Sequence, residues 1–457
     1  MRLVEADEPW LDRVPAEWTR SRIRNVAELS PPFSGNAPAH DEPCTVVPME
    51  LLSEQGQINS SNVQPFEDVT PGLTLFENGD VLFAKITPCM ENGKGALVEN
   101  LPTRYAFGST EFHVLRASHA AVAKFLYYYT FNPVFRVYAA ENMSGAAGQK
   151  RVSSRFFKNT RLFLPPLPEQ QRIAAYLDAS CAGIDTAVAA KRRQLETLDV
   201  LRKSIIQRAV TRGISARVAL ESTGNAWMEQ IPRGWKLVCL KRIAEIQGGL
   251  TLGKQYEGPL IERPYLRVGN VQDGHLDLAD VSVIELPAGV AAGVELRPDD
   301  VLMTEGGDLD KLGRGHLWRG EIPGCLHQNH IFAVRCFLHK LKPMFLAYVT
   351  AAKYGRDYFE ATGKKTTNLA CTNANKVGEF PIPLPPVTEQ EAICAHLDEK
   401  LGEVKRIVAG IESQIATLTA YRKSLIHECV TGQRRVTDED LRRAGPAGSI
   451  RPVERRP

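Results

Sequence analysis

The stretch LPPLPEQQRIAAYLD at residues 164–178 recurs as LPPVTEQEAICAHLD at residues 384–398, 220 positions further along the chain. Each stretch opens on clustered prolines, which lack an amide hydrogen and cannot continue a strand or the interior of a helix. Beyond the prolines, each stretch continues as a long helical pattern that is not broken by a cluster of turn-forming residues. The prolines therefore mark, twice in one chain, the point at which a globular domain ends and a long helix begins.

The segments that follow the prolines carry apolar residues spaced three and four apart over five turns or more. This spacing predicts helices over residues 168–212 and 388–431, each roughly 60 Å long at 1.5 Å per residue. The two stripes are Ile173, Leu177, Ile184, Val188, Leu195, Leu198 and Ile205, and Ile393, Leu397, Val404, Ile411, Ile415, Leu418 and Leu425. Such stripes are typical of a coiled-coil seam, so we expect the two helices to pack on each other. The alternative is that each helix folds back on its own domain.

The repetition extends outward from these stretches. VPAEWTRSRIRNVAEL from Val14 corresponds to IPRGWKLVCLKRIAEI from Ile231, and GDVLFAKITPCMENGKGAL (79–97) corresponds to DDVLMTEGGDLDKLGRGHL (299–317). FLYYYT (125–130) and FLAYVT (345–350) are again 220 residues apart. The chain is therefore a tandem duplication with a repeat of about 220 residues. Two copies predict a pseudo-twofold molecule.

The predicted fold class is α+β, with two globular domains of mixed α/β structure joined by two long antiparallel helices that form a coiled coil. Short alternating patterns such as GDVLFAKI and HIFAVRC indicate half-buried strands in both domains. The expected boundaries are a first domain at 1–167, its helix at 168–212, a linker at 213–226, a second domain at 227–387, its helix at 388–431, and a disordered tail at 432–457.

Composition narrows the class of protein. The 457 residues include 43% hydrophobic residues, and 56 Lys and Arg against 53 Asp and Glu give a net charge of +3, which excludes a disordered chain or a polycation. The nine cysteines are scattered without a CxxC pair, which argues against structural zinc and a disulfide framework. No apolar run approaches the roughly 18 residues of a transmembrane helix. We expect a cytoplasmic protein that does not enter a membrane.

Catalytic signatures do not appear in the sequence. It contains no GxxxxGK[ST] phosphate loop, GxSxG elbow or HExxH motif. Ser30-Pro31-Pro32-Phe33 resembles the tetrapeptide of adenine-N6 methyltransferases, but no glycine-rich loop for S-adenosylmethionine lies nearby. His327 and His330 have a spacing that suits a metal, yet no further ligand is in register, so they are interpreted as core or loop histidines. We expect no catalytic residues, no cofactor and no metal.

The strand-flanking loops instead suggest recognition of DNA. ENGKGA (91–96) and KLGRGH (311–316) each place a cation between glycines, and GQKR (148–151) and GKKTTN (363–368) combine cations with amide or hydroxyl groups. Such groups contact phosphate oxygens and base edges. The candidate DNA contacts are Lys85, Lys94, Gln149, Lys150 and Arg151 in the first domain, and Arg314, Lys364, Lys365, Thr366 and Thr367 in the second. The alternative for any one loop is a solvated surface turn.

Several of these motifs together resemble one family. DVLFAKITPCMENGKGAL (80–97), GSTEFHVLR (108–116) and AGQKRV (147–152) in the first copy, with PYLRVGNVQDGHLDL (264–278) and DVLMTEGGDLDKLGRG (300–315) in the second, are similar to the DNA specificity subunit of type I restriction–modification systems. The resemblance covers about residues 1–431. It implies two target-recognition domains, each reading one half of a bipartite double-stranded DNA site, with the helices fixing the spacing.

The resemblance also implies partners. Specificity subunits of this family are not catalytic alone; two modification subunits bring S-adenosylmethionine and methylate adenine N6, and restriction subunits translocate and cut DNA with ATP and magnesium. The helices are the expected docking surface for these subunits. Two other classes stay open: a single-chain enzyme, against which the missing motifs argue, and a coiled-coil adaptor whose end domains bind proteins.

Overall fold

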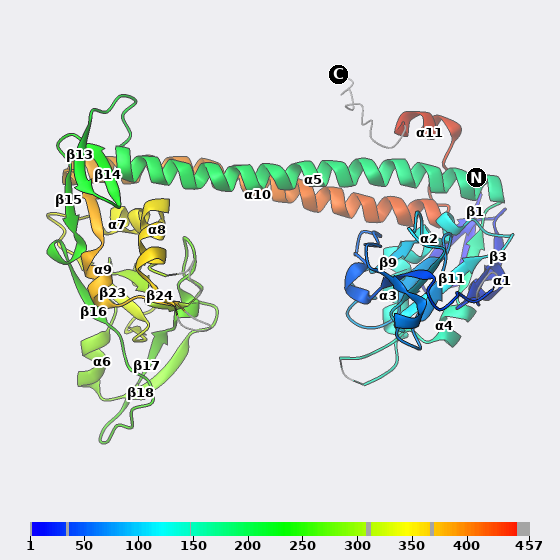
Figure 1. Ribbon diagram of the computed structural model, residues 1–457, viewed down its shortest axis with the longest axis horizontal. Helices are drawn as coiled ribbons and strands as arrows, with labels where there is room; N and C mark the ends of the chain where they lie inside the picture. Colours follow the sequence, from blue (N-terminus) through cyan, green and yellow to red (C-terminus); the bar gives the residue numbers. More distant parts are fainter. Residues whose placement is uncertain (1, 33–35, 147, 308–311, 366–369, 446–457) are drawn as a thin grey trace. The chain divides into compact units, whose positions relative to one another are not determined.

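The computed structural model describes residues 2–32, 36–146, 148–307, 312–365 and 370–445. The chain forms two compact units, drawn in Figure 1. The first unit comprises residues 1–192 and 412–457, and the second comprises residues 193–411. Two long helices, α5 (Leu167–Arg212) and α10 (Val387–Val430), each contribute one part to each unit.

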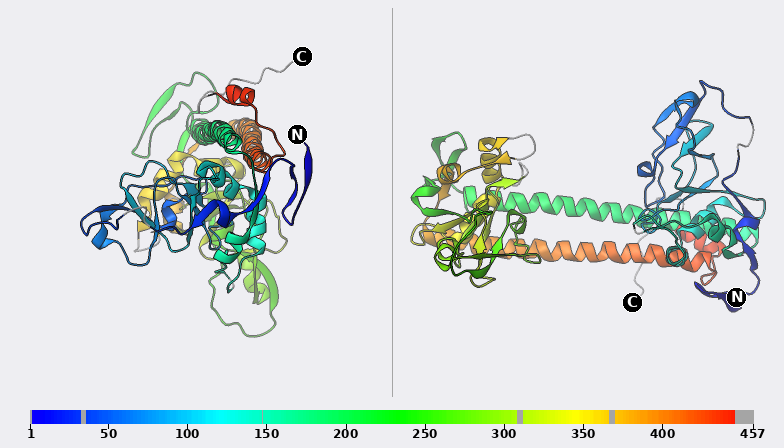
Figure 2. Two further views of the ribbon diagram at one scale, coloured as in Figure 1. Left: turned by 90° about the vertical axis from the view of Figure 1, so that its right-hand side faces the viewer. Right: turned by 90° about the horizontal axis from the view of Figure 1, so that it is seen from below.

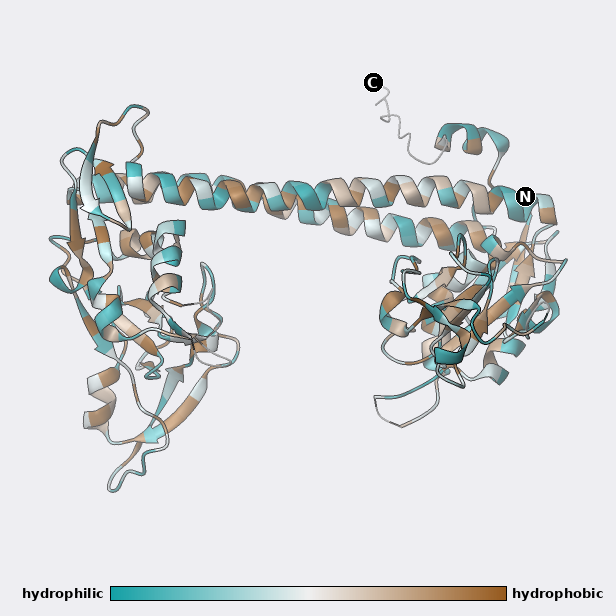
Figure 3. Cartoon of the chain, in the orientation of Figure 1, coloured by the Kyte–Doolittle hydropathy of each residue, from teal (hydrophilic) through white to brown (hydrophobic). Residues whose placement is uncertain are grey.

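The two long helices pack antiparallel within each unit. In the first unit, Ile173 and Leu177 near the start of α5 share one buried cluster with Leu425 and Ile426 near the end of α10. In the second unit the order is reversed, since the last turns of α5 (Ile206 and Val210) join Ile393 and Leu397 from the start of α10. Polar and apolar residues alternate along both helices in Figure 3, and the helices run side by side in both views of Figure 2. The expected fold class is confirmed.

The first unit contains two four-stranded sheets. One has the order β4 (Ala27–Leu29), β11 (Phe112–Ala117), β8 (Val81–Ala84), β9 (Gly95–Leu97), all antiparallel. The other has the order β6 (Val63–Pro65), β5 (Pro43–Val47), β10 (Tyr105–Gly108), β7 (Thr74–Phe76), with β5 and β10 parallel. The remaining elements are hairpin β1 (Leu3–Glu8) and β2 (Leu11–Pro15), the pair β3 (Thr19–Arg22) and β12 (Arg161–Leu164), and helices α1 (Ile23–Val26), α2 (Ala123–Phe131), α3 (Pro133–Glu141) and α4 (Ser154–Asn159).

The second unit repeats this plan. Its main sheet has the order β16 (Ala244–Gly248), β23 (Ile331–Cys336), β19 (Val301–Thr304), β21 (Gly315–Leu317). A second sheet contains β18 (Ser282–Leu286), β17 (Ile261–Leu266) and β22 (Leu326–His327), and a third contains β20 (Gly306–Gly307), β25 (Ala370–Cys371) and β24 (Lys364–Lys365). The other elements are β13 (Leu220–Asn225) with β14 (Met228–Pro232), β15 (Lys236–Cys239) with β26 (Pro381–Leu384), and helices α6 (Ala288–Val294), α7 (Pro343–Ala351), α8 (Lys353–Thr362) and α9 (Ala374–Glu379).

A duplicated ion pair holds the main sheet of each unit. Asp80 comes directly before β8, and its carboxylate accepts hydrogen bonds from Arg116 Nε at 2.8 Å and Nη2 at 2.7 Å. In the second unit Asp300 pairs with Arg335 at 3.0 and 3.3 Å. Both aspartates are buried. The bidentate geometry offsets the cost of burying the charges. The same aspartate–arginine pair is present in both units.

Two expected boundaries differ from the structure. Residues 432–457 were expected to be disordered, but α11 (Asp438–Ala444) lies within them, with a capping box between Thr437 and Asp440. Leu441 and Ala444 pack against the core of the first unit, which gives this short helix its stability. Residues 213–226 were expected to be a linker, but β13 lies there and pairs with β14. Short helices and hairpins are difficult to predict because they lack a sustained periodic spacing of apolar residues.

Helix α5 contains a stretch that is apolar and long enough, by composition alone, to cross a membrane. The expectation that no apolar segment reaches this length does not hold for α5, and 39% of its apolar stretch is buried in the structure. Ile173, Leu177 and Cys181 are buried in the first unit's core, Asp178 accepts a hydrogen bond from Tyr128 at 2.7 Å, and Asp185 forms an ion pair with Arg422 of α10. These contacts place the N-terminal part of α5 in the core of the first unit.

Candidate nucleic-acid interface

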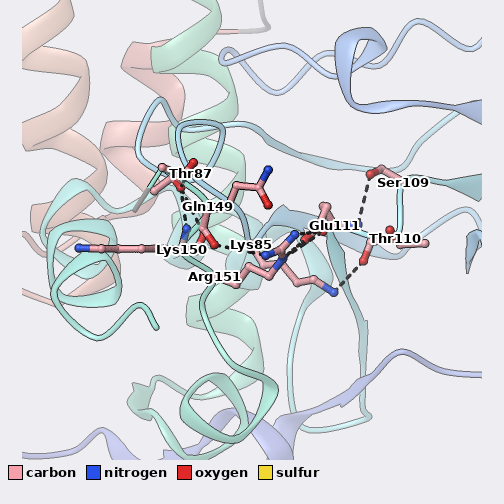
Figure 4. A network of polar contacts seen from close by, with 9 residues as sticks. Lys85, Thr87, Ser109, Thr110, Glu111, Gln149, Lys150 and Arg151 are labelled. Atoms are coloured by element: carbon pink, nitrogen blue, oxygen red, sulfur yellow. Dashed lines mark hydrogen bonds and ion pairs between the residues drawn. The ribbon is translucent and has the colours of Figure 1, made fainter. Parts of the chain in front are cut away.

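Three segments of the first unit converge at one end of its main sheet. Lys85 follows β8, Glu111 precedes β11, and Val152 precedes α4. The amide of Lys85 donates to the carbonyl of Glu111 at 2.9 Å, and the amide of Val152 donates to the carbonyl of Lys85 at 2.8 Å. These backbone bonds bring Gln149, Lys150 and Arg151 beside Lys85, as Figure 4 shows.

Arg151 is held in place by a carboxylate. Its Nη2 lies 2.8 Å from Glu111 Oε1, and its Nε lies 3.0 Å from both carboxylate oxygens. The hydrogen bond from Arg151 lowers the pKa of Glu111, so this carboxyl group stays ionised. Nη1 of Arg151 donates to the carbonyl of Gln149 at 3.2 Å. The guanidinium is therefore fixed in orientation while part of it remains exposed.

The other candidates in this cluster divide into fixed and exposed groups. The Lys85 ammonium donates to the carbonyl of Thr110 at 2.7 Å. Lys150 and Gln149 are exposed, and in Figure 4 the Lys150 ammonium points away from the paired groups. The backbone of Lys150 is fixed, because its amide donates to Thr87 Oγ1 at 3.0 Å and its carbonyl accepts from the Thr87 amide at 3.0 Å. A positioned backbone with an exposed cation suits contact with a phosphate.

The structure does not bring Lys94 into this cluster. Lys94 is half-buried, and its ammonium donates to the carbonyl of Met49 at 2.8 Å. The bond ties the loop between β8 and β9 to a short 3-10 helix, Met49–Leu51. Its place between two glycines suggested an exposed cation, and the sequence carried no sign of an acceptor 45 residues upstream.

The second unit has the same backbone frame with different side chains. The amide of Glu305 donates to the carbonyl of His330, and the amide of Thr372 donates to the carbonyl of Glu305, at 2.8 and 2.7 Å. Glu305 thus occupies the place of Lys85, and His330 that of Glu111. The imidazole Nδ1 of His330 lies 3.0 Å from Glu305 Oε2.

The second-unit candidates lie around this frame. The carbonyl of Arg314 accepts from the amide of Thr304 at 3.1 Å, next to Glu305. Lys364 and Lys365 form β24, which is joined through β25 to β20, directly after Glu305. Thr366 and Thr367 lie outside the described residues. The frame therefore places Arg314 and the β24 lysines at one end of the sheet.

The sequence did not single out Thr87, Glu111 and His330 as members of the candidate interface. The signal was present, because Glu111 and His330 each precede the matching buried strand, β11 or β23. His327 is fully buried, and its Nδ1 lies 2.9 Å from the carbonyl of Ile331, as expected of a core histidine. Within the described part of the chain, no group of three or more His, Cys, Asp or Glu side chains is arranged to hold a metal ion.

The fold is similar to those of two solved proteins. It aligns over 92% of this chain and 99% of a chain from a structure of the type I R-M system, a study of complex assembly and conformational transition, with a TM-score of 0.71 and 20% identity. It also aligns with the HsdS subunit of Thermoanaerobacter tengcongensis over 92% of this chain and 98% of that one, with a TM-score of 0.50 and 19% identity. The architecture is that of solved type I specificity subunits.

The sequence leads to the same family. Residues 15–197 match the family model of the type I restriction modification DNA specificity domain. The EcoAI specificity subunit of Escherichia coli is 34% identical over 173 residues, which are 37% of this chain and 29% of that relative's length. The EcoKI specificity subunit of Escherichia coli strain K12 is 22% identical over 407 residues, or 84% of each chain. The chain therefore contains a type I restriction modification DNA specificity domain, and its sequence is similar to those of type I specificity subunits.

Proposed function

We propose that each unit reads one half of a bipartite double-stranded DNA target, and that α5 and α10 set the separation of the two halves. The observation that carries this proposal is the shared frame with different side chains. Lys85 and Glu111 in the first unit correspond to Glu305 and His330 in the second. One backbone framework with different chemistry suits two surfaces that read different sequences.

The chemistry of the loops supports separate roles for phosphate contacts and base contacts. The exposed cations Lys150 and Lys364 supply salt-dependent affinity for phosphates. The fixed guanidinium of Arg151 and the exposed amide of Gln149 supply hydrogen bonds to base edges. Two half-sites joined by one spacer raise the affinity only when their separation fits the spacer. Discrimination therefore depends on both sequence and distance.

The partners follow from this role. The names of the relatives describe specificity subunits of type I restriction enzymes. We infer that this chain is a non-catalytic, cytoplasmic subunit without a cofactor of its own. It would join two modification subunits, which use S-adenosylmethionine to methylate adenine N6, and ATP-dependent restriction subunits that translocate and cut DNA. The long helices are the proposed docking surface for the modification subunits.

The test is adenine methylation across the genome of the native host, compared with a strain that lacks this gene. Loss of one bipartite methylated motif, restored by the wild-type gene, is the expected result. Complementation with Arg151→Ala is expected to relax the bases of only one half of that motif. An unchanged methylation pattern, together with no modification subunit co-purifying with the chain, would contradict the proposal and favour the adaptor alternative.

A further inference from the structure

We propose that Arg136 positions the recognition surface of the first unit without touching DNA, by holding the loop between β8 and β9 in its binding conformation. This inference rests on the proposed function. Arg136 is buried in α3. It lies beneath the loop of residues 85–94, one end of which carries Lys85 and Thr87.

The Arg136 guanidinium bridges two separate segments through backbone carbonyls. Its Nη1 donates to Met90 at 2.7 Å and its Nη2 donates to Lys94 at 3.4 Å, both in the loop. Its Nε donates to Thr130, in the last turn of α2, at 2.9 Å. A Cβ atom on Gly95 would lie 3.2 Å from Arg136 Nη2 and 2.7 Å from the carbonyl of Leu82. Glycine at this position therefore leaves room for both the neighbouring strand β8 and the guanidinium.

A cation is costly at the buried position of Arg136. The ion pairs among the described residues include no carboxylate partner for Arg136, and its charge lies between the rings of Phe83 and Phe131, with ring centroids 4.8 and 4.9 Å away. Burial lowers the pKa of Arg136 to about 9. An apolar side chain of similar size avoids the cost of burying a charge. What an apolar side chain cannot do is hold three carbonyls at fixed positions.

The fixed loop is connected directly to the interface. The amide of Met90 donates to the carbonyl of Ile86 at 2.9 Å. Thr87 follows Ile86 in the chain, and its amide donates to the carbonyl of Lys150 at 3.0 Å. Movement at Met90 therefore shifts Thr87, and with it the backbone of Lys150. Arg136 acts on recognition through these contacts.

The second unit has a matching residue. Arg356, 220 positions after Arg136, is likewise the fourth residue of its helix, α8. Its Nη1 donates at 3.3 Å to the carbonyl of Leu312, in the corresponding loop after β19. Arg356 is only half-buried, so the arrangement is retained in outline while the contacts differ. We assign Arg356 the same positioning role for the second half-site.

The test compares three variants of the full chain in complex with its modification subunits. Arg136→Met keeps the bulk and removes the donors, and Arg136→Lys keeps the charge but cannot bridge three carbonyls. Leu162→Ala is the control for lost stability, because Leu162 is fully buried in β12. Binding is measured by fluorescence anisotropy, with the methylated motif of the wild-type strain and with duplexes altered in one half-site.

Arg136→Met is expected to reduce discrimination at the first half-site at least tenfold, with the second half-site and the salt dependence unchanged. Arg136→Lys is expected to lie between Arg136→Met and wild type, and Leu162→Ala to lower the melting temperature while keeping the discrimination. Discrimination within twofold of wild type in Arg136→Met, or an equal loss at both half-sites, would overturn the proposal. Absence of specific binding by the wild-type complex would instead overturn the proposed function.

A second measurement does not depend on DNA. Hydrogen exchange of the free chain is expected to show faster exchange of the Asn92 and Lys94 amides in Arg136→Lys. These amides donate to the carbonyls of Pro88 and Cys89 within the loop. If Arg136→Met does not fold, Arg356→Met provides the matching binding test, with a loss expected only at the second half-site. Unchanged loop exchange in Arg136→Lys would also contradict the positioning role.

Discussion

Gln170, fully buried in the first turn of α5, accepts a hydrogen bond of 2.8 Å from the backbone amide of Val122. Its side-chain amide donates to the carbonyls of Ala120 and Pro165 at 3.2 and 2.9 Å. Gln390 repeats all three contacts at the start of α10, accepting from the amide of Lys342 at 2.8 Å. The glutamine of each PEQ or TEQ motif therefore joins a long helix to the domain that precedes it.

Replacement of this glutamine tests the joint. Gln170→Leu is expected to destabilise the first unit by about 2–4 kcal/mol, because three buried backbone groups lose their partners. The measurement is urea-induced unfolding of the full chain. Gln171→Leu is the matched control, since Gln171 is exposed and its replacement should change the free energy of unfolding by less than about 0.5 kcal/mol. Equal effects of the two changes would contradict the role of Gln170.

Neutralising Glu111 tests whether Arg151 must be fixed to read bases. Glu111→Gln removes the charge that pairs with Arg151. Discrimination at the first half-site is expected to fall about tenfold, roughly the value of one weakened base contact. Affinity for unrelated duplex should rise, because one negative charge is lost. Glu91→Gln, at an exposed position in the neighbouring loop, makes the same change in charge and should leave the discrimination intact.

Lys150 is expected to contact phosphate rather than bases. Lys150→Ala should weaken binding to target and non-target duplexes alike and reduce the slope of log K against log salt by about 0.9. Titrations at several salt concentrations measure this slope. Lys158→Ala, an exposed lysine of α4 outside the interface, should leave the slope unchanged. A loss confined to the target duplex would identify Lys150 as a base contact instead.

His113 makes the first unit sensitive to acid. Its Nε2 lies 2.8 Å from the carbonyl of Val152, beneath the interface, and burial lowers the pKa of His113 from 6.5 to about 4. The unfolded chain therefore binds this proton from about pH 6.5 downward and the folded chain only near pH 4. The corresponding stability is complete above pH 6.5 and is lost as the pH falls, by about 2 kcal/mol at pH 5.

The measurement for His113 is urea unfolding at pH 7 and pH 5. His113→Gln, which does not titrate, is expected to lose about 2 kcal/mol less than wild type between these two pH values. His119→Gln, at an exposed histidine, should behave as wild type. If His113→Gln loses as much stability as wild type, the buried imidazole is not the source of the sensitivity.

The proposed spacing role predicts the effect of longer helices. Seven residues inserted after Arg192 in α5 and seven after Ile411 in α10 keep both apolar stripes in register. They lengthen each helix by about 10 Å, so the methylated half-sites should move apart by about three base pairs with their bases unchanged. A seven-residue insertion after Gly258, in an exposed loop, should leave the spacing as it is. An unaltered spacing in the lengthened chain would exclude the helices as the spacer.

The sequence by itself determined the duplication, the two long helices and the resemblance to type I specificity subunits. These properties are periodic or are repeated along the chain, so they are visible in residues close together or at a constant offset. Leu177 and Leu397 belong to apolar stripes that predict their burial, and both are fully buried.

Only the tertiary structure decided which side chains come together in the candidate interface. Lys85 meets Thr110 and Arg151 meets Glu111 across 25 and 40 residues of sequence, and Lys94 turns instead to the carbonyl of Met49. Arg136 has no local signal at all, because its acceptors lie 6, 42 and 46 residues away. Partners this distant are set by how strands and loops pack, and hydrogen bonding then selects which cations are fixed within the protein and which remain exposed to solvent.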